Sequence, residues 1–120
     1  MLNLDTHILV AALADELTPR EQILVMNESL AVSDIVLWEL SKLVQLGRLQ
    51  LDMDSVAFRR SLRYLNVIPI TIQIARKSTE LDFASDPADE LIAATSVVER
   101  IPLLTRDQKI LKSRMVPLAK

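Results

Sequence analysis

The sequence predicts an α/β fold with a central, mainly parallel sheet that helices cover on both faces. Short apolar runs have the length and composition of buried strands. Helical patterns stand between these runs, and this alternation is typical of parallel sheets. The chain has 120 residues, of which 50% are hydrophobic, so it can form a real core. We therefore expect a single domain over residues 1–120.

Boundary residues define the elements of the first half. We expect strands at 1–5 and 30–33, and helices at 6–13, 19–27 and 34–46. Thr18 is a predicted N-cap, Pro19 suits the first helical position, and Glu21 completes a capping box. Ser33 is expected to cap the helix at 34–46, and Gly47 to end it.

The second half repeats the alternation. We expect helices at 54–65, 72–77, 87–99 and about 107–112, and strands at 67–70, 103–105 and, as a short edge, 116–118. Pro69 indicates a strand end or an edge strand. Asp86 is a predicted N-cap before Pro87, and Asp89 falls in the first turn, where the helix dipole favours an anion. That helix is apolar almost all round, so we expect it to be buried.

Composition excludes several classes of protein. The absence of cysteine excludes disulfides, thiolate metal sites and thiol catalysis, and fits a cytoplasmic location. No apolar run approaches the roughly 18 residues of a membrane span, and the first residues lack a basic secretory region. A net charge of −2 argues against a strongly cationic nucleic-acid binder. Residues 100–120 nevertheless carry six basic side chains and one acidic one, so this end could meet phosphates.

Four carboxylates are candidates for one site. Asp5 ends the first strand and Asp107 follows the strand at 103–105, so both are expected at the same sheet edge. Glu39 falls on the margin of its helix's apolar stripe, and Asp89 lies at a helix start. Clustered carboxylates need a counter-charge, and oxygen ligands favour Mg²⁺ or Mn²⁺. Such a site suits metal-assisted phosphodiester hydrolysis.

Simpler interpretations stay open for these residues. The aspartates could cap helices, and Glu39 could be an ordinary glutamate at the edge of a helix face. His7 is the only histidine, and a core or supporting role is favoured over catalysis. There is no Gly-rich phosphate loop.

Four sequence pieces, taken together and in order, resemble the PIN-domain ribonucleases, specifically VapC-type toxins of bacterial toxin–antitoxin pairs. They are Leu4-Asp5-Thr6-His7, then Trp38-Glu39-Leu40 with Leu46-Gly47-Arg48-Leu49, then Asp86-Pro87-Ala88-Asp89 with Leu91-Ile92-Ala93-Ala94, and Pro102-Leu103-Leu104-Thr105-Arg106-Asp107. The chain departs from the relatives most similar around Trp38 in two places. Ala84-Ser85 replaces a usual His-Arg, and Ala88-Asp89-Glu90 replaces a usual Phe-Asp-Arg.

The resemblance implies an α/β/α sandwich and Mg²⁺-dependent cleavage of RNA. It assigns the metal-binding and catalytic carboxylates to Asp5, Glu39, Asp89 and Asp107. Thr6 and Asp86 are implied beside the ligands, and Arg106 and Lys109 are candidate RNA contacts. The resemblance also implies a homodimer, a cognate antitoxin, and no DNA-reading element in the toxin itself.

Two other functions remain as alternatives. A receiver-like signalling domain also places acids at strand ends, but it needs a paired acidic cluster after the first strand and a late lysine. A binding-only module, including an inactive PIN-like one, would use its acids merely as helix caps.

Overall fold

The computed structural model describes residues 1–120 and contains one four-stranded sheet in which all neighbouring strands run parallel. The strands are β1 (Leu2–Leu4), β2 (Leu30–Ser33), β3 (Leu65–Ile68) and β4 (Leu103–Leu104), in the spatial order β3-β2-β1-β4. Both β1 and β4 are buried along their whole length, as strands covered on two faces must be. The predicted parallel sheet is confirmed.

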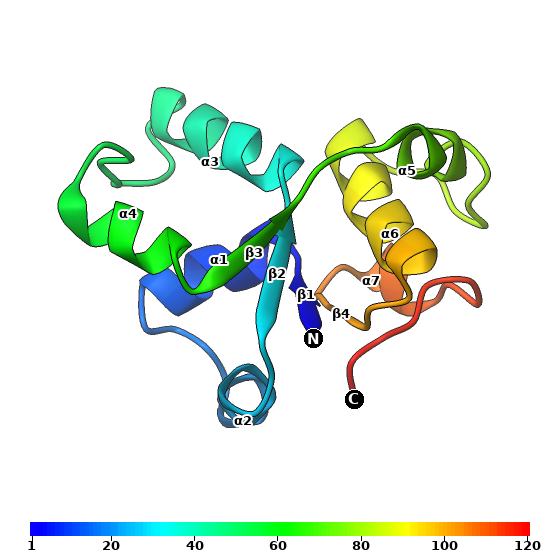
Figure 1. Cartoon of the computed structure of the whole chain (residues 1–120), viewed down its shortest axis with the longest axis horizontal. Helices are drawn as coiled ribbons and strands as arrows, with labels where there is room; N and C mark the ends of the chain where they lie inside the picture. Colours follow the sequence, from blue (N-terminus) through cyan, green and yellow to red (C-terminus); the bar gives the residue numbers. More distant parts are fainter.

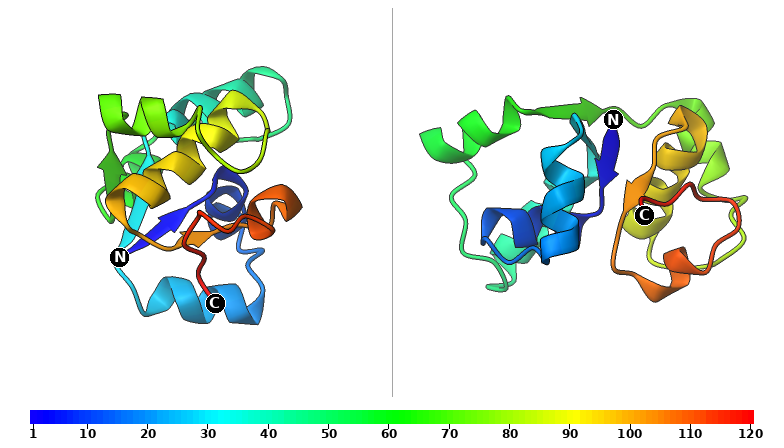
Figure 2. Two further views of the ribbon diagram at one scale, coloured as in Figure 1. Left: turned by 90° about the vertical axis from the view of Figure 1, so that its right-hand side faces the viewer. Right: turned by 90° about the horizontal axis from the view of Figure 1, so that it is seen from below.

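Seven helices cover the sheet. They are α1 (Thr6–Leu13), α2 (Pro19–Met26), α3 (Ile35–Gln45), α4 (Val56–Leu62), α5 (Ile72–Lys77), α6 (Pro87–Glu99) and α7 (Gln108–Leu111). In Figure 1, α1, α3 and α4 lie on one side of the sheet, and α5, α6 and α7 lie on the other. The view from below in Figure 2 shows the same separation, so the predicted three-layer α/β/α sandwich is confirmed.

The direction of the chain across the sheet reverses between β1 and β4. The first three strands step outward in one direction, and β4 then adds to the opposite side of β1. As a result α1 leaves β1 on one face and α7 leaves β4 on the other (Figure 1). Such a switch point opens a crevice beyond the carboxyl ends of the two strands, which is where α/β proteins bind their ligands.

Several predicted boundaries are confirmed. Thr18 and Glu21 form the capping box that starts α2, with Pro19 at its first position. Gly47 follows α3 with φ +71°, a conformation that glycine adopts without a steric cost.

The predicted edge strand at 116–118 is reduced to a single bridge between Leu103 and Leu118.

Three predicted boundaries are wrong. The helix expected at 54–65 is only α4, and the strand expected at 67–70 is β3, two residues earlier. This register lets β3 pair with β2 over four residues, from Leu30↔Leu65 to Ser33↔Ile68. Pro69 therefore follows the end of an edge strand, as its missing N–H requires. The N-cap position of α3 is held by Asp34, because Ser33 still belongs to β2; the Asp34 side chain makes no capping bond, and Ser33 Oγ accepts from the Ile35 N–H at 3.3 Å.

Helix α6 has more buried residues than any other helix, and Asp89 lies in its first turn. Residues Ile92 to Ser96 cover more than one full turn and are all fully buried, so this part of α6 is covered all round, as its apolar composition predicts. The Asn3 side chain on β1 donates to Ser96 Oγ at 2.9 Å and to the Ile92 carbonyl at 3.3 Å. These buried hydrogen bonds hold α6 against the strand that leads to Asp5. With 13 residues, α6 is the longest helix, and none of the helices could span a membrane.

Candidate active site

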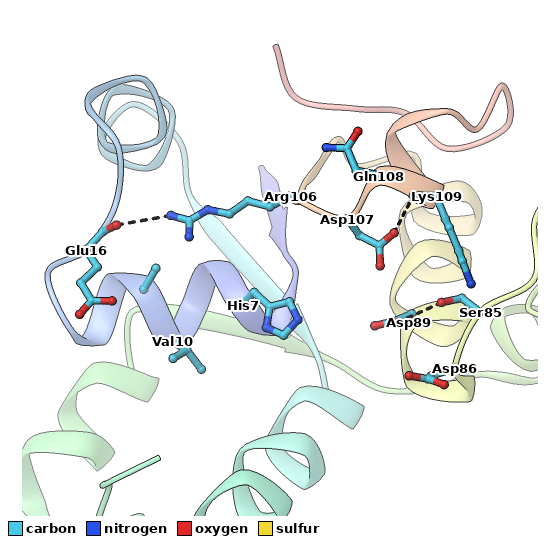
Figure 3. A pocket seen from close by; sticks show the side chains of 11 residues that line it. His7, Val10, Glu16, Ser85, Asp86, Asp89, Arg106, Asp107, Gln108 and Lys109 are labelled. Atoms are coloured by element: carbon cyan, nitrogen blue, oxygen red, sulfur yellow. Dashed lines mark hydrogen bonds between the residues drawn. The ribbon is translucent and has the colours of Figure 1, made fainter. Parts of the chain in front are cut away.

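A cleft of about 600 Å³ opens at the switch point between β1 and β4 (Figure 3). Its volume is in the range of small-ligand sites, ~300–1,000 Å³. The lining side chains come from α1, from the start of α6 and from the segment after β4. They are His7, Val10, Ala11, Glu16, Ser85, Asp86, Asp89, Arg106, Asp107, Gln108 and Lys109.

Asp5 is buried, follows the end of β1 and does not itself line the cleft; its backbone N–H donates to the Leu104 carbonyl of β4 at 3.0 Å. It is the N-cap of α1, and its Oδ1 accepts from the Thr6 backbone N–H at 2.8 Å. Its Oδ2 accepts from the Thr105 hydroxyl at 2.5 Å. The same hydroxyl oxygen accepts from the Asp107 backbone N–H at 3.0 Å. Thr105 therefore connects the two predicted strand-end carboxylates, and the parallel pairing of Leu4 with Leu104 explains why they meet.

Glu39 and Asp89 are the half-buried carboxylates of the cluster. Glu39, on α3, accepts a short hydrogen bond from the Thr6 hydroxyl. Asp89 accepts one from the Ser85 hydroxyl at 3.1 Å. Burial raises the pKa of both carboxyl groups, and the negative charge of Asp5 raises each further. Asp89 also raises the pKa of Glu39, and Asp107 that of Asp89.

The four predicted ligands therefore influence one another electrostatically. None of the four forms a salt bridge with a basic side chain. In each of three carboxylates, one oxygen accepts no hydrogen bond: these oxygens are Glu39 Oε2, Asp89 Oδ1 and Asp107 Oδ2. Uncompensated carboxylates with unused oxygens fit a hard divalent cation. As the side chains stand, however, no three Asp, Glu or His residues lie close enough to hold one ion.

The two aspartates predicted as caps behave differently. Asp107 caps α7, because its Oδ1 accepts from the backbone N–H groups of Lys109 at 2.8 Å and Ile110 at 3.3 Å. Asp86 occupies the N-cap position of α6, but its side chain makes no capping hydrogen bond. The predicted N-cap position of Asp86 is confirmed, whereas the side-chain hydrogen bond of a cap is absent. The exposed Asp86 side chain lies at the cleft instead.

His7 lies elsewhere than predicted, and Thr105 and Ser85 make contacts that no local pattern in the sequence indicates. His7 is not a core residue: its side chain is exposed and lies in the middle of the cleft (Figure 3). Thr105 was not identified as a partner of Asp5, although the register of β1 against β4 makes the two neighbours. Ser85 appeared only as a departure from the relatives, yet its hydroxyl binds Asp89.

Arg106 makes an ion pair that the sequence did not indicate. Its Nη2 and Nε donate to the two carboxylate oxygens of Glu21 at 2.6 and 2.9 Å. The Glu21 side chain is only 7% exposed and that of Arg106 is 44% exposed. The pair lowers the pKa of Glu21 to about 2. Arg106 and Lys109, the predicted RNA contacts, both line the cleft, and only Lys109 has no salt-bridge partner there.

The Glu21–Arg106 pair predicts a pH-dependent contribution to stability. Because the folded state lowers the pKa of Glu21 from 4.5 to about 2, the stabilisation is complete above pH 4.5 and is lost as the pH falls toward 2. At pH 7, Glu21→Gln should lower the free energy of unfolding by about 2 kcal/mol. This is less than the full pKa shift would correspond to, because solvent around the partly exposed Arg106 screens the ion pair. Urea denaturation of both proteins should show this difference shrinking toward zero near pH 2. A difference that stays constant with pH would contradict the assignment.

Comparisons with known proteins agree with this fold. The PIN domain family model matches residues 3–114. Ribonuclease VapC22 of Mycobacterium tuberculosis is 31% identical over 90 residues, which cover 72% of this chain and 69% of that protein.

Two solved structures are similar along nearly the whole chain. One is VapBC2 from Rickettsia felis bound to a promoter DNA fragment, with a TM-score of 0.71, 23% identity and coverage of 99% of this chain and 98% of that chain. The other is FitAcB from Neisseria gonorrhoeae, with a TM-score of 0.72, 18% identity and coverage of 100% and 97%. The matched family model and the M. tuberculosis relative show that the chain belongs to the PIN-domain family of VapC-type ribonucleases.

Proposed function

We propose that the protein is a Mg²⁺-dependent endoribonuclease that acts as the toxin of a type II toxin–antitoxin pair. The observation that carries this proposal is the cluster of four carboxylates with no basic partner at the switch point of the sheet. The raised pKa values of Glu39 and Asp89 mean that their ionised forms lack compensation. The name of the relative, a ribonuclease, supports the reaction class.

Each carboxylate has a distinct supporting role in this proposal. Asp5 and Asp89 are the principal metal ligands, and Glu39 and Asp107 complete the site, directly or through water. The hydroxyls of Thr6, Ser85 and Thr105 fix the orientations of Glu39, Asp89 and Asp5. Asp5, Glu39, Asp89 and Asp107 are the residues that would hold the ion. Mg²⁺, or Mn²⁺ in its place, would supply counter-charge and acidify the attacking water.

The substrate is proposed to be RNA whose phosphates approach along the segment after β4. Lys109 lines the cleft on the same side as Asp89 and Asp107 (Figure 3). Because its ammonium forms no salt bridge, it is free to neutralise a phosphate beside the cleaved bond.

A cognate antitoxin and a second copy of the chain are the proposed protein partners. The VapBC2 complex, which has a similar fold, is bound to promoter DNA. This chain has no DNA-reading element of its own. Any operator binding would therefore belong to the antitoxin. The exposed Trp38 on α3 supports a protein-binding surface beside Glu39.

The alternatives fit the structure less well. A receiver-like domain needs a paired acidic cluster after its first strand, but Thr6 and His7 follow Asp5 here. A module whose acids only cap helices explains Asp5 and Asp107. It does not explain Glu39 and Asp89, because these half-buried carboxylates cap nothing.

The direct test is cleavage of a defined RNA by the purified chain. We expect internal cleavage with Mg²⁺ or Mn²⁺ and none with EDTA. Expression of the chain should arrest growth, and co-expression of the protein from the neighbouring gene should relieve the arrest. A pure, folded protein that cleaves no RNA with either metal would contradict the nuclease assignment.

A further inference from the structure

The cleft has two chemically different sides. The carboxylate side consists of Ser85, Asp86, Asp89, Asp107 and Lys109. The arginine side consists of His7, Val10, Ala11, Glu16 and Arg106. Figure 3 shows Arg106 extending away from Asp107 toward Glu16, with His7 between the two sides. Of the residues that line the cleft, the proposed hydrolysis uses only those of the carboxylate side, and the arginine side takes no part in the chemical step.

Arg106 is held rigidly in this position. Glu21, on α2, is buried and grips the guanidinium through two hydrogen bonds of 2.6 and 2.9 Å. A third contact runs from Nη2 to the Glu16 backbone carbonyl at 3.4 Å. The capping box fixes Glu21 in turn, since its Oε1 accepts from the Thr18 N–H at 2.9 Å. A flexible side chain is thus fixed at the wall of a cleft.

The pairing also changes what Arg106 can offer a ligand. Because Glu21 compensates its charge, the pair has little net attraction for a phosphate. Nη1 takes part in no hydrogen bond with the protein, so its N–H groups remain available as directional donors. Beside them, Val10 and Ala11 provide apolar contact and His7 an exposed ring. Fixed donors, an apolar floor and a flat ring match a nucleobase better than a phosphate.

We propose that the arginine side binds the base of one nucleotide next to the cleaved phosphodiester bond. Arg106 donates from Nη1 to an acceptor on that base, and Glu21 is the residue that positions Arg106. The matched base is one that turns a single acceptor toward Nη1, because Nε and Nη2 are engaged by Glu21 and the parallel donor pair that reads guanine O6 and N7 is not free. This inference rests on the proposed RNA cleavage, because it assigns the substrate contact of that same cleft.

The test is the base preference of cleavage on an RNA library that is random around the cut site, read by sequencing. The wild type should favour one base, about 10-fold, at one position beside the cut, which is within the discrimination that an arginine–base contact provides. Arg106→Ala should flatten that position and leave cleavage itself detectable. Arg106→Lys should flatten it as well, because lysine keeps the charge but not the planar donor geometry.

Glu21→Gln tests the positioning role, with Arg48→Ala as the control. Glu21→Gln should weaken the same base preference at a temperature where its melting curve shows a folded protein. Arg48 is exposed and makes no side-chain hydrogen bond, so Arg48→Ala should keep the wild-type preference.

The outcomes separate the two proposals. A wild type that cleaves no RNA counts against the nuclease itself. An active Arg106→Ala variant with an unchanged preference overturns the base subsite alone, as does a wild type without any preference at that position. If Arg106→Lys keeps the preference, Arg106 acts as a simple charge and the subsite is again overturned. If Arg106→Ala only weakens antitoxin binding, the arginine side belongs to the protein partner and not to RNA.

Discussion

Asp89→Asn is expected to lower the rate of Mg²⁺-dependent RNA cleavage by about 10³-fold, because it removes one principal ligand charge from the cluster. Asparagine keeps the size of the side chain and can still accept the Ser85 hydrogen bond. The measurement is the initial rate on a defined RNA at saturating Mg²⁺. A variant with more than a tenth of the wild-type rate would contradict the role of Asp89.

The same substitution should stabilise the metal-free protein. The folded state raises the pKa of Asp89, so its ionised form destabilises folding at neutral pH, and this penalty disappears as the pH falls below the unfolded-state pKa. Loss of activity with a gain in stability cannot result from misfolding. Glu99→Gln, at the far exposed end of α6, removes an equal charge outside the cleft and should leave the cleavage rate unchanged.

Thr105→Val should lower cleavage by about 10- to 100-fold, which is typical of residues that orient a metal ligand. Valine has the shape of threonine but cannot donate to Asp5 or accept from the Asp107 N–H. Both carboxylates would therefore lose a fixed orientation. Cleavage kinetics under the same conditions give the measurement.

Two further variants test the cause of that loss. Thr105→Ser keeps the hydroxyl and should restore most of the activity. Thr79→Val removes an exposed hydroxyl that binds only the Arg76 carbonyl, and it should have no effect on cleavage. Equal activities for Thr105→Val and the wild type would show that the Asp5–Thr105 bond does not matter for the reaction.

Local signals in the sequence predicted much of the fold. The helix start at Thr18, the helix end at Gly47 and the helix at 72–77 depend on neighbouring residues, and the structure has them where expected. The position of β3 depends on its pairing with β2, which lies about 35 residues earlier, so the apolar run at 67–70 was misleading. Pairing energy between strands is not visible in a local pattern.

The candidate site shows the same division. Asp5 and Asp107 were placed together correctly because parallel strands end at one edge. The bond between Glu21 and Arg106 joins residues 85 positions apart, and no local rule predicts it. Asp86 precedes Pro87 at a predicted helix start and occupies the N-cap position, but its side chain accepts no hydrogen bond from a backbone N–H of the first turn. Capping preference describes a position and does not fix the rotamer that fills it.

The binding of a divalent cation by the carboxylate cluster is the central claim, and thermal or urea unfolding with increasing Mn²⁺ or Mg²⁺ tests it most directly. At a metal concentration of 100 times Kd, the wild type should gain about 2.7 kcal/mol of unfolding free energy. Asp89→Asn should gain far less at the same concentration, and Glu99→Gln should gain as much as the wild type. A wild type without metal-dependent stabilisation, or an equal gain in Asp89→Asn, would contradict the claim.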